Sequence, residues 1–86
     1  MDYIKIVRTG TFSSNVGYFS DAMSFDTHGL AVKLKVISGS LKICARIADN
    51  DKYGYYELGE GETAELFGSF VYYGTAKVQY MLLDKV

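Results

Sequence analysis

Cys44 and His28 are the side chains best suited to covalent chemistry, because the sequence contains one cysteine and one histidine. A thiol in contact with an imidazole would form a nucleophile and its base. A serine triad would need the same histidine, and no serine stands in the Gly-x-Ser-x-Gly turn that exposes such a nucleophile. Cys44 also falls within an alternating apolar run, which is typical of a strand. The sequence therefore predicts no catalytic residue, and we expect the protein not to be an enzyme.

The segment 49–60 has the spacing of a calcium-binding loop of the EF-hand type. Asp49 and Asp51 occupy its first and third positions, a glycine its sixth and Glu60 its twelfth. The fifth position should offer a side-chain oxygen close to the ion, but Tyr53 stands there. Aspartate and asparagine are also favoured in ordinary turns, where they bond to nearby backbone groups. The sequence therefore predicts a polar turn from Asp49 to Lys52, with no metal and no cofactor.

Tyrosine is the most distinctive residue type, with eight tyrosines, five phenylalanines and no tryptophan. Its ring and hydroxyl suit protein interfaces, and the same chemistry suits stacking on sugar rings. Consecutive residues of a strand face opposite sides, so two adjacent tyrosines cannot both enter one core. The candidate interface or glycan-binding residues are Tyr53, Tyr55, Tyr56, Tyr72 and Tyr73. The alternative is that strands simply favour tyrosine.

Charge and hydropathy argue against several kinds of partner. The net charge is −1 at pH 7 and there is no basic stripe, so we expect no nucleic-acid binding. No apolar run approaches the ~20 residues that span a bilayer, so we expect no membrane partner. The start of the chain lacks a basic segment followed by a long apolar one, which predicts synthesis in the cytoplasm without a signal peptide. A single cysteine cannot form an intrachain disulfide.

Period-two alternation of apolar residues predicts that strands position all these side chains. It runs on both sides of Ser38-Gly39-Ser40 and predicts a β-hairpin over 30–48, and a third run covers 76–83. Weaker strands are expected at 2–8, 16–20, 53–58, 62–67 and 69–73, with one helical turn over 20–25 as an alternative. The expected core residues are Leu30, Val32, Leu34, Val36, Leu41, Ile43, Ile47, Val78, Tyr80 and Leu82.

Seven or eight short strands predict a single all-β domain over residues 1–86. We expect a small antiparallel β-sandwich of the jelly-roll kind. A chain of 86 residues buries only about 60–65% of its unfolded surface, so its core has little surplus stability. The sequence has no proline to protect a strand edge from pairing with another chain. Both properties favour a homo-oligomer.

Two segments of the second half resemble a known class of protein. They are the turn Tyr56-Glu57-Leu58-Gly59-Glu60-Gly61-Glu62 with Leu66 after it, and the final run Ala76-Lys77-Val78-Gln79-Tyr80-Met81-Leu82. Over residues 30–86 the sequence resembles small β-sandwich virion proteins of tailed bacteriophages, of the head-decoration and head-fibre type. That resemblance implies a non-enzymatic, oligomeric module assembled in the host cytoplasm, and it transfers no site residue.

We therefore expect a structural or assembly module that self-associates through tyrosine-bearing strands. The resemblance implies a homotrimer, a place in the virion and contacts with other virion proteins. The alternative is a carbohydrate-binding β-sandwich that stacks sugars on its exposed tyrosines. The rings that would form this platform are Tyr53, Tyr55, Tyr72 or Tyr73.

Overall fold

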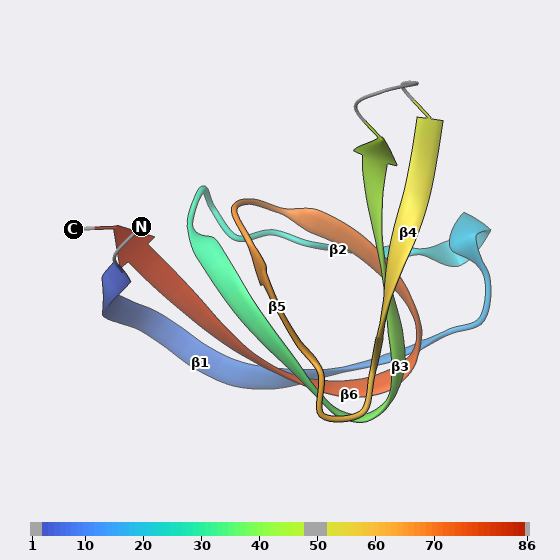
Figure 1. Ribbon diagram of the computed structural model, residues 1–86, viewed down its shortest axis with the longest axis horizontal. Coiled ribbons are helices and arrows are strands. Elements are labelled where there is room, and N and C mark those ends of the chain that lie inside the picture. The colour runs from blue at the N-terminus through green and yellow to red at the C-terminus, as the bar shows by residue number, and fades with distance from the viewer. Residues whose placement is uncertain (1–2, 48–51, 86) are drawn as a thin grey trace.

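The computed structural model describes residues 3–47 and 52–85, which form one antiparallel sheet of six strands (Figure 1). The strands are β1 (Tyr3–Val16), β2 (Met23–Phe25), β3 (Ala31–Ile47), β4 (Lys52–Gly59), β5 (Thr63–Leu66) and β6 (Phe70–Lys85), and Phe19–Asp21 form a turn of 3-10 helix, η1. The predicted small, all-β, antiparallel class is confirmed.

β3 and β6 are the central strands, with 17 and 16 residues, and they pair with each other along most of their length. Along the outer side of β6, β2 pairs first and β1 follows. Along the outer side of β3, β5 pairs first and β4 follows. Each central strand therefore has two successive partners, and β1 and β4 form opposite ends of the strand order β1-β6-β3-β4.

Both central strands bend at the same level, so the sheet folds into two packed layers (Figure 1). Gly39 in β3 and Gly74 in β6 have φ angles of 84° and 110°, which L side chains rarely adopt. A Cβ atom at Gly39 would clash with the Thr75 carbonyl oxygen, and one at Gly74 would lie 2.6 Å from the Ser40 carbonyl oxygen. The backbones approach so closely at the bend that these positions require glycine.

The two layers are defined by this bend. Layer A consists of β1, β5 and the halves of β3 and β6 that pair with them. Layer B consists of β2, β4 and the other halves of the central strands. Figure 1 shows the β3–β4 hairpin of layer B extending away from the rest of the sheet.

The predicted hairpin over 30–48 is wrong, because β3 continues through Ser38-Gly39-Ser40. The register between β3 and β6 shifts between Val36 and Ser38, which is the mark of a β-bulge. The extra residue reverses which positions face inward, so Val36 is buried before the bulge and Leu41 after it. Glycine and serine here bend a strand that stays paired.

Two further differences from prediction concern β6 and the end of β1. The expected strands 69–73 and 76–83 are one strand, β6, which bends at Gly74 and does not end there. The expected strand 16–20 is the end of β1 followed by η1, close to the helical turn considered as an alternative. Six strands, three of them long, therefore replace the seven or eight short ones.

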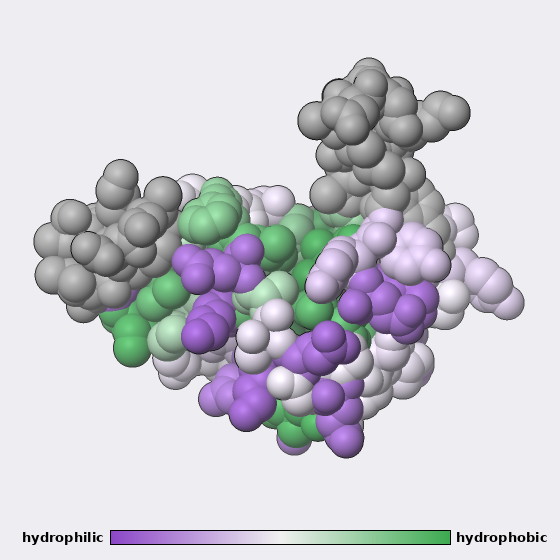
Figure 2. Space-filling view, viewed as in Figure 1, coloured by the Kyte–Doolittle hydropathy of each residue, from purple (hydrophilic) through white to green (hydrophobic). Residues whose placement is uncertain are grey.

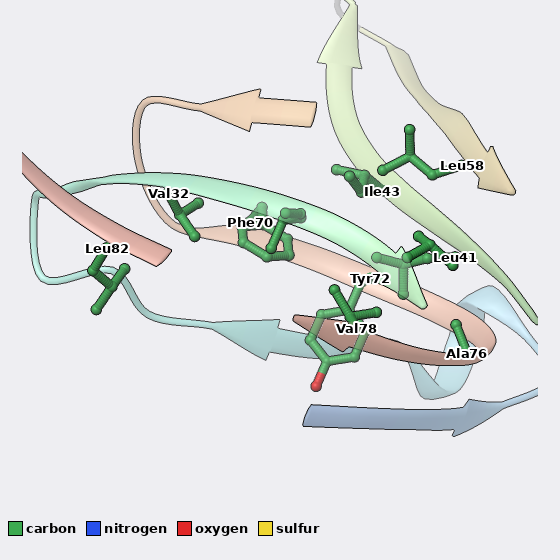
Figure 3. Close-up of a cluster of buried hydrophobic side chains, with 11 residues drawn as sticks. Val32, Leu41, Ile43, Leu58, Phe70, Tyr72, Ala76, Val78 and Leu82 are labelled. Carbon is green, nitrogen blue, oxygen red and sulfur yellow. The ribbon is translucent and has the colours of Figure 1, made fainter. Parts of the chain in front are cut away.

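The core lies between the two layers (Figure 3). It consists of Val32, Leu34, Val36, Leu41, Ile43, Leu58, Phe70, Tyr72, Ala76, Val78 and Leu82. Most of the predicted core residues are in this cluster, and Leu30 and Tyr80 pack against its border. The side chain of Ile47 lies outside the described residues.

Aromatic rings join the two layers. The ring of Phe12, from layer A, lies 5.0 Å from that of Tyr72 and 5.4 Å from that of Phe25, both from layer B. Phe25 also makes an edge contact with Tyr80 of layer A at 5.0 Å and stacks on Phe70 at 5.3 Å. Tilted and edge contacts at these distances are favourable for aromatic pairs. The cluster holds the folded sheet closed.

Candidate interaction surface

The structure does not bring Cys44 and His28 together. Cys44 lies within β3 with 7% of its surface exposed, and burial raises the pKa of its thiol, which disfavours the reactive thiolate. His28 lies in the turn between β2 and β3 and is exposed, with a φ of 53°. These positions provide no activated nucleophile.

The His28 side chain belongs instead to a loop held by Asp26. The carboxylate of Asp26 accepts hydrogen bonds from the His28 backbone N–H at 2.8 Å and the Ser69 hydroxyl at 3.0 Å. These two bonds, the backbone one foremost, lower the pKa of Asp26. The Ser69 oxygen also accepts a bond from the Thr27 N–H at 3.0 Å. Ser69 therefore bonds to the carboxylate and not to the imidazole, and these bonds fasten the loop to the start of β6.

The described residues contain neither a cluster of metal ligands nor a membrane-spanning helix. Among the residues described, no three His, Cys, Asp or Glu side chains are placed to hold a metal ion. Residues 49–51 of the predicted polar turn lie outside the described residues, and Lys52 is the first residue of β4. No helix in the described ranges is long and apolar enough to cross a membrane.

The most distinctive surface is the outer face of layer B, where β4, β3 and β6 lie side by side. Lys42 of β3 lies opposite Glu57 of β4 on one side and Tyr73 of β6 on the other. Two residues further along β3, Cys44 lies between Tyr55 of β4 and Val71 of β6. Residues directly opposite in neighbouring strands have their side chains on the same face. We call this surface the tyrosine face, and its members are Lys42, Cys44, Tyr55, Glu57, Val71 and Tyr73.

Contacts within the tyrosine face hold its side chains in place. The rings of Tyr55 and Tyr73 meet edge to face, with centroids 6.1 Å apart and planes at 73°. The Lys42 Nζ lies 5.5 Å from the centroid of Tyr73 and 3.7 Å from the Glu57 Oε2. The Ser40 hydroxyl donates a 2.6 Å hydrogen bond to the same Glu57 oxygen. The charges of this surface are thus paired, and its aromatic rings are fixed before any partner binds.

The charge pair has a clear electrostatic effect. The hydrogen bond from Ser40, and then the positive charge of Lys42, lower the pKa of Glu57. Glu57 is therefore ionised at neutral pH, and Lys42 balances its charge. A partner that covers this surface meets a locally neutral surface with two fixed tyrosines.

The five candidate tyrosines differ in location and in exposure to solvent. Tyr55 and Tyr56 are 60% and 66% exposed, on opposite faces of β4. Tyr73 is half-buried on the tyrosine face. Tyr72 is 7% exposed in the core, where burial raises its pKa, so it is wrong as a candidate for interface or glycan contact. The side chain of Tyr53 lies outside the described residues.

The sequence does not reveal that Lys42, Cys44 and Val71 belong to this surface. Their grouping depends on the strand order β4-β3-β6 and on the register of three strands that are far apart in the chain. The alternation around Lys42 indicates only that it faces away from the core. The space-filling view shows weakly and strongly polar side chains over the described part of the β3–β4 hairpin, beside apolar atoms near the centre of the molecule (Figure 2).

A second feature is a groove of about 290 Å³ on the outer face of layer A. Lys33 and Lys35 of β3 line it, together with Thr63 of β5 and Gln79 and Met81 of β6. Both lysines are exposed. Among the described residues that line the groove, no polar side chain is buried and held in position to bind a ligand. The groove therefore does not indicate which ligand it would take.

Comparison with known proteins adds no identification. The sequence matches no protein-family model, and no curated protein is significantly similar to it.

Proposed function

We propose that this protein is a non-enzymatic structural module that self-associates through its tyrosine face. The observation that carries the proposal is Tyr55, which lies 60% exposed on an edge strand and packs against Tyr73. Large exposed aromatic rings near the centre of a well-packed surface are typical of residues that dominate binding energy. A second copy of the chain is the proposed partner.

The tyrosine face suits a protein partner because it is organised in advance. The ring contact and the Ser40–Glu57–Lys42 pairing fix long side chains that would otherwise lose freedom on binding. Covering an exposed tyrosine ring removes on the order of 100 Å² from water. At about 25 cal/mol per Å², this contributes about 2.5 kcal/mol before the entropy of association is subtracted.

The same geometry is less suited to the carbohydrate alternative. A sugar ring stacks on a flat aromatic face, whereas the rings of Tyr55 and Tyr73 stand at 73° to each other and present no common plane. Lys42 also lies over the ring of Tyr73. The two tyrosines therefore fit an irregular protein surface better than a planar saccharide.

A trimer, the number that the phage resemblance implies, is compatible with the two faces of β4. A closed ring of three copies needs two different surfaces on each copy. The exposed rings of Tyr55 and Tyr56 lie on opposite faces of this edge strand. We extend the proposal to a component of a phage virion on the resemblance alone, with assembly in the host cytoplasm and contacts to other virion proteins.

The direct test is the mass of the Tyr55→Lys variant, measured by light scattering at tens of micromolar. A buried lysine without a partner is costly, so we expect the variant to lose the wild-type oligomer. Ile37→Lys is the matched control, because Ile37 is an apolar residue, 41% exposed, at the bulge of β3 and seven residues along the strand from Cys44 of the tyrosine face. An unchanged mass in Tyr55→Lys would refute the proposed interface. A monomeric wild type would instead favour the carbohydrate alternative, which a glycan array would then test.

A further inference from the structure

β1 forms a free edge of the folded sheet. Within the described ranges it pairs with β6 alone, and it lies at the end of the strand order (Figure 1). The backbone N–H and C=O groups along its outer side therefore face away from the sheet. Such an edge is a ready template for another strand unless charge, proline, irregular pairing or a covering element prevents it.

The two halves of β1 differ in protection. From Tyr3 to Arg8 the strand carries the charges of Lys5 and Arg8, and its register with β6 is interrupted twice. From Thr9 to Val16 the register is continuous and there is no charged residue and no proline. At about 3.3 Å per residue, this unprotected edge is about 26 Å long.

The other edge strands of the described sheet are better protected. β5 has four residues, one of them Glu65, and β2 has three residues between Asp21 and Asp26. β4 contains Lys52 and Glu57. β1 is thus the longest edge strand and the one least protected against pairing with another chain. This is unexpected for a protein that stays monomeric.

We propose that the edge Thr9–Val16 pairs antiparallel with the same edge of a second copy, about a two-fold axis perpendicular to the sheet. This extends the proposed self-association to a second surface. Two-fold contacts of this kind are the commonest in homo-oligomers, because each surface needs only to complement itself. The pairing adds main-chain hydrogen bonds and joins two folded sheets edge to edge.

Side-chain direction restricts where the axis can lie. Phe12 and Ser14 face inward, and Thr9, Thr11, Ser13 and Asn15 are exposed on the outer face. Opposite residues must point to the same side of the joined sheet. One residue of β1 must therefore lie directly opposite the same residue of the other copy. The axis then lies midway between the two copies of that residue, and near the middle of the free edge that residue is Thr11, Phe12 or Ser13.

The charge pattern fits a second copy in each of these three registers. Arg8 of one copy then lies opposite an uncharged residue of the other: Ser14, Val16 or Tyr18 respectively. The outer-face residues bring together hydroxyl and amide side chains, and threonine and serine pairs across strands are favourable. No register places like charges opposite each other along Thr9–Val16.

The edge and the tyrosine face are independent. β1 and β4 lie at opposite ends of the strand order, so one molecule can use both surfaces at once. A protein that pairs about a two-fold axis along β1, and that also associates through the tyrosine face, can form assemblies larger than either contact would produce alone.

The test uses the Tyr55→Lys background, in which the tyrosine face is disabled. We expect this variant to be a dimer of twice the 9.6 kDa chain mass. Adding Thr11→Lys and Ser13→Lys should give the monomer, because in each of the three registers introduced lysines of the two copies lie opposite each other. Both positions are exposed on the outer face, so the fold should survive, as circular dichroism would check. Glu60→Gln with Glu65→Gln is the control, because it changes the net charge equally at exposed positions away from β1.

Each outcome separates the two surfaces. A Tyr55→Lys variant that is already monomeric would overturn the edge pairing and leave the tyrosine face supported. A dimer that persists with both lysines, or that dissociates equally with both glutamines, would also overturn it. If the two lysines alone convert the wild type to a monomer, the edge pairing holds and the tyrosine face fails.

Discussion

The side chain of Thr27 is fully buried, and its hydroxyl oxygen has no hydrogen-bond partner among the described residues. Leaving a buried hydroxyl unsatisfied costs about 1–3 kcal/mol. Valine has the same branched shape without the hydroxyl. We expect Thr27→Val to raise the free energy of unfolding by about 1 kcal/mol, seen as a higher urea midpoint with an unchanged m value.

Thr27→Ser is the matched variant, because it keeps the hydroxyl and removes the methyl group. We expect it to lower the midpoint, since it leaves a small cavity and the same unsatisfied oxygen. The reverse order of the two variants would mean that the hydroxyl is bonded in solution, for example to an internal water.

At the scale of residues, the sequence predicted most of the core but not which tyrosine of each pair enters it. The information for Tyr72 was present. The even positions Ala76, Val78 and Leu82 face the core, and the same parity continues across Gly74 to Tyr72. Reading Gly74 as a turn broke that series. For Tyr55 and Tyr56 no such series exists, because both rings are exposed at the edge of the sheet.

The bend of the central strands is the feature of the elements that most determines the fold. Gly74 has a φ of 110°, and an added Cβ atom would lie 2.6 Å from a backbone oxygen that cannot move without breaking the β3–β6 pairing. We expect Gly74→Ala to lower the free energy of unfolding by at least about 2 kcal/mol, from backbone strain and this contact. A thermal or urea melt measures the loss.

Gly17→Ala is the control for that prediction. Gly17 has no atom within 4 Å of an added Cβ, and its φ is not positive. Alanine there should change stability by no more than about 1 kcal/mol, and in the stabilising direction. Equal losses in the two variants would mean that the bend does not depend on glycine.

At the scale of elements, the alternation predicted the strands but not their continuity. Ser38-Gly39-Ser40 has the composition of a hairpin turn, and locally nothing distinguishes a turn from a bend. The outcome depends on β6, which carries Gly74 next to this point and pairs with β3 on both sides of it. At the bend that pairing joins Ser40 to Thr75, which are 35 positions apart in the chain, so no local pattern contains it.

The whole molecule is a small folded sheet, and we propose that two of its surfaces bind other copies of the chain. The tyrosine face lies over β4, β3 and β6, and the uncharged edge lies along the second half of β1. Small size and missing prolines indicate association from the sequence, but neither surface follows from it. Both depend on strand order, which places Lys42 beside Tyr73 and leaves β1 without a second neighbour.

The measurement that tests self-association most directly is the light-scattering mass of the wild-type protein at tens of micromolar. We predict a mass of at least three chains of 9.6 kDa. We also predict that the mass falls on dilution, as expected for an assembly held by contacts of this size. A mass of one chain at that concentration would contradict the central claim.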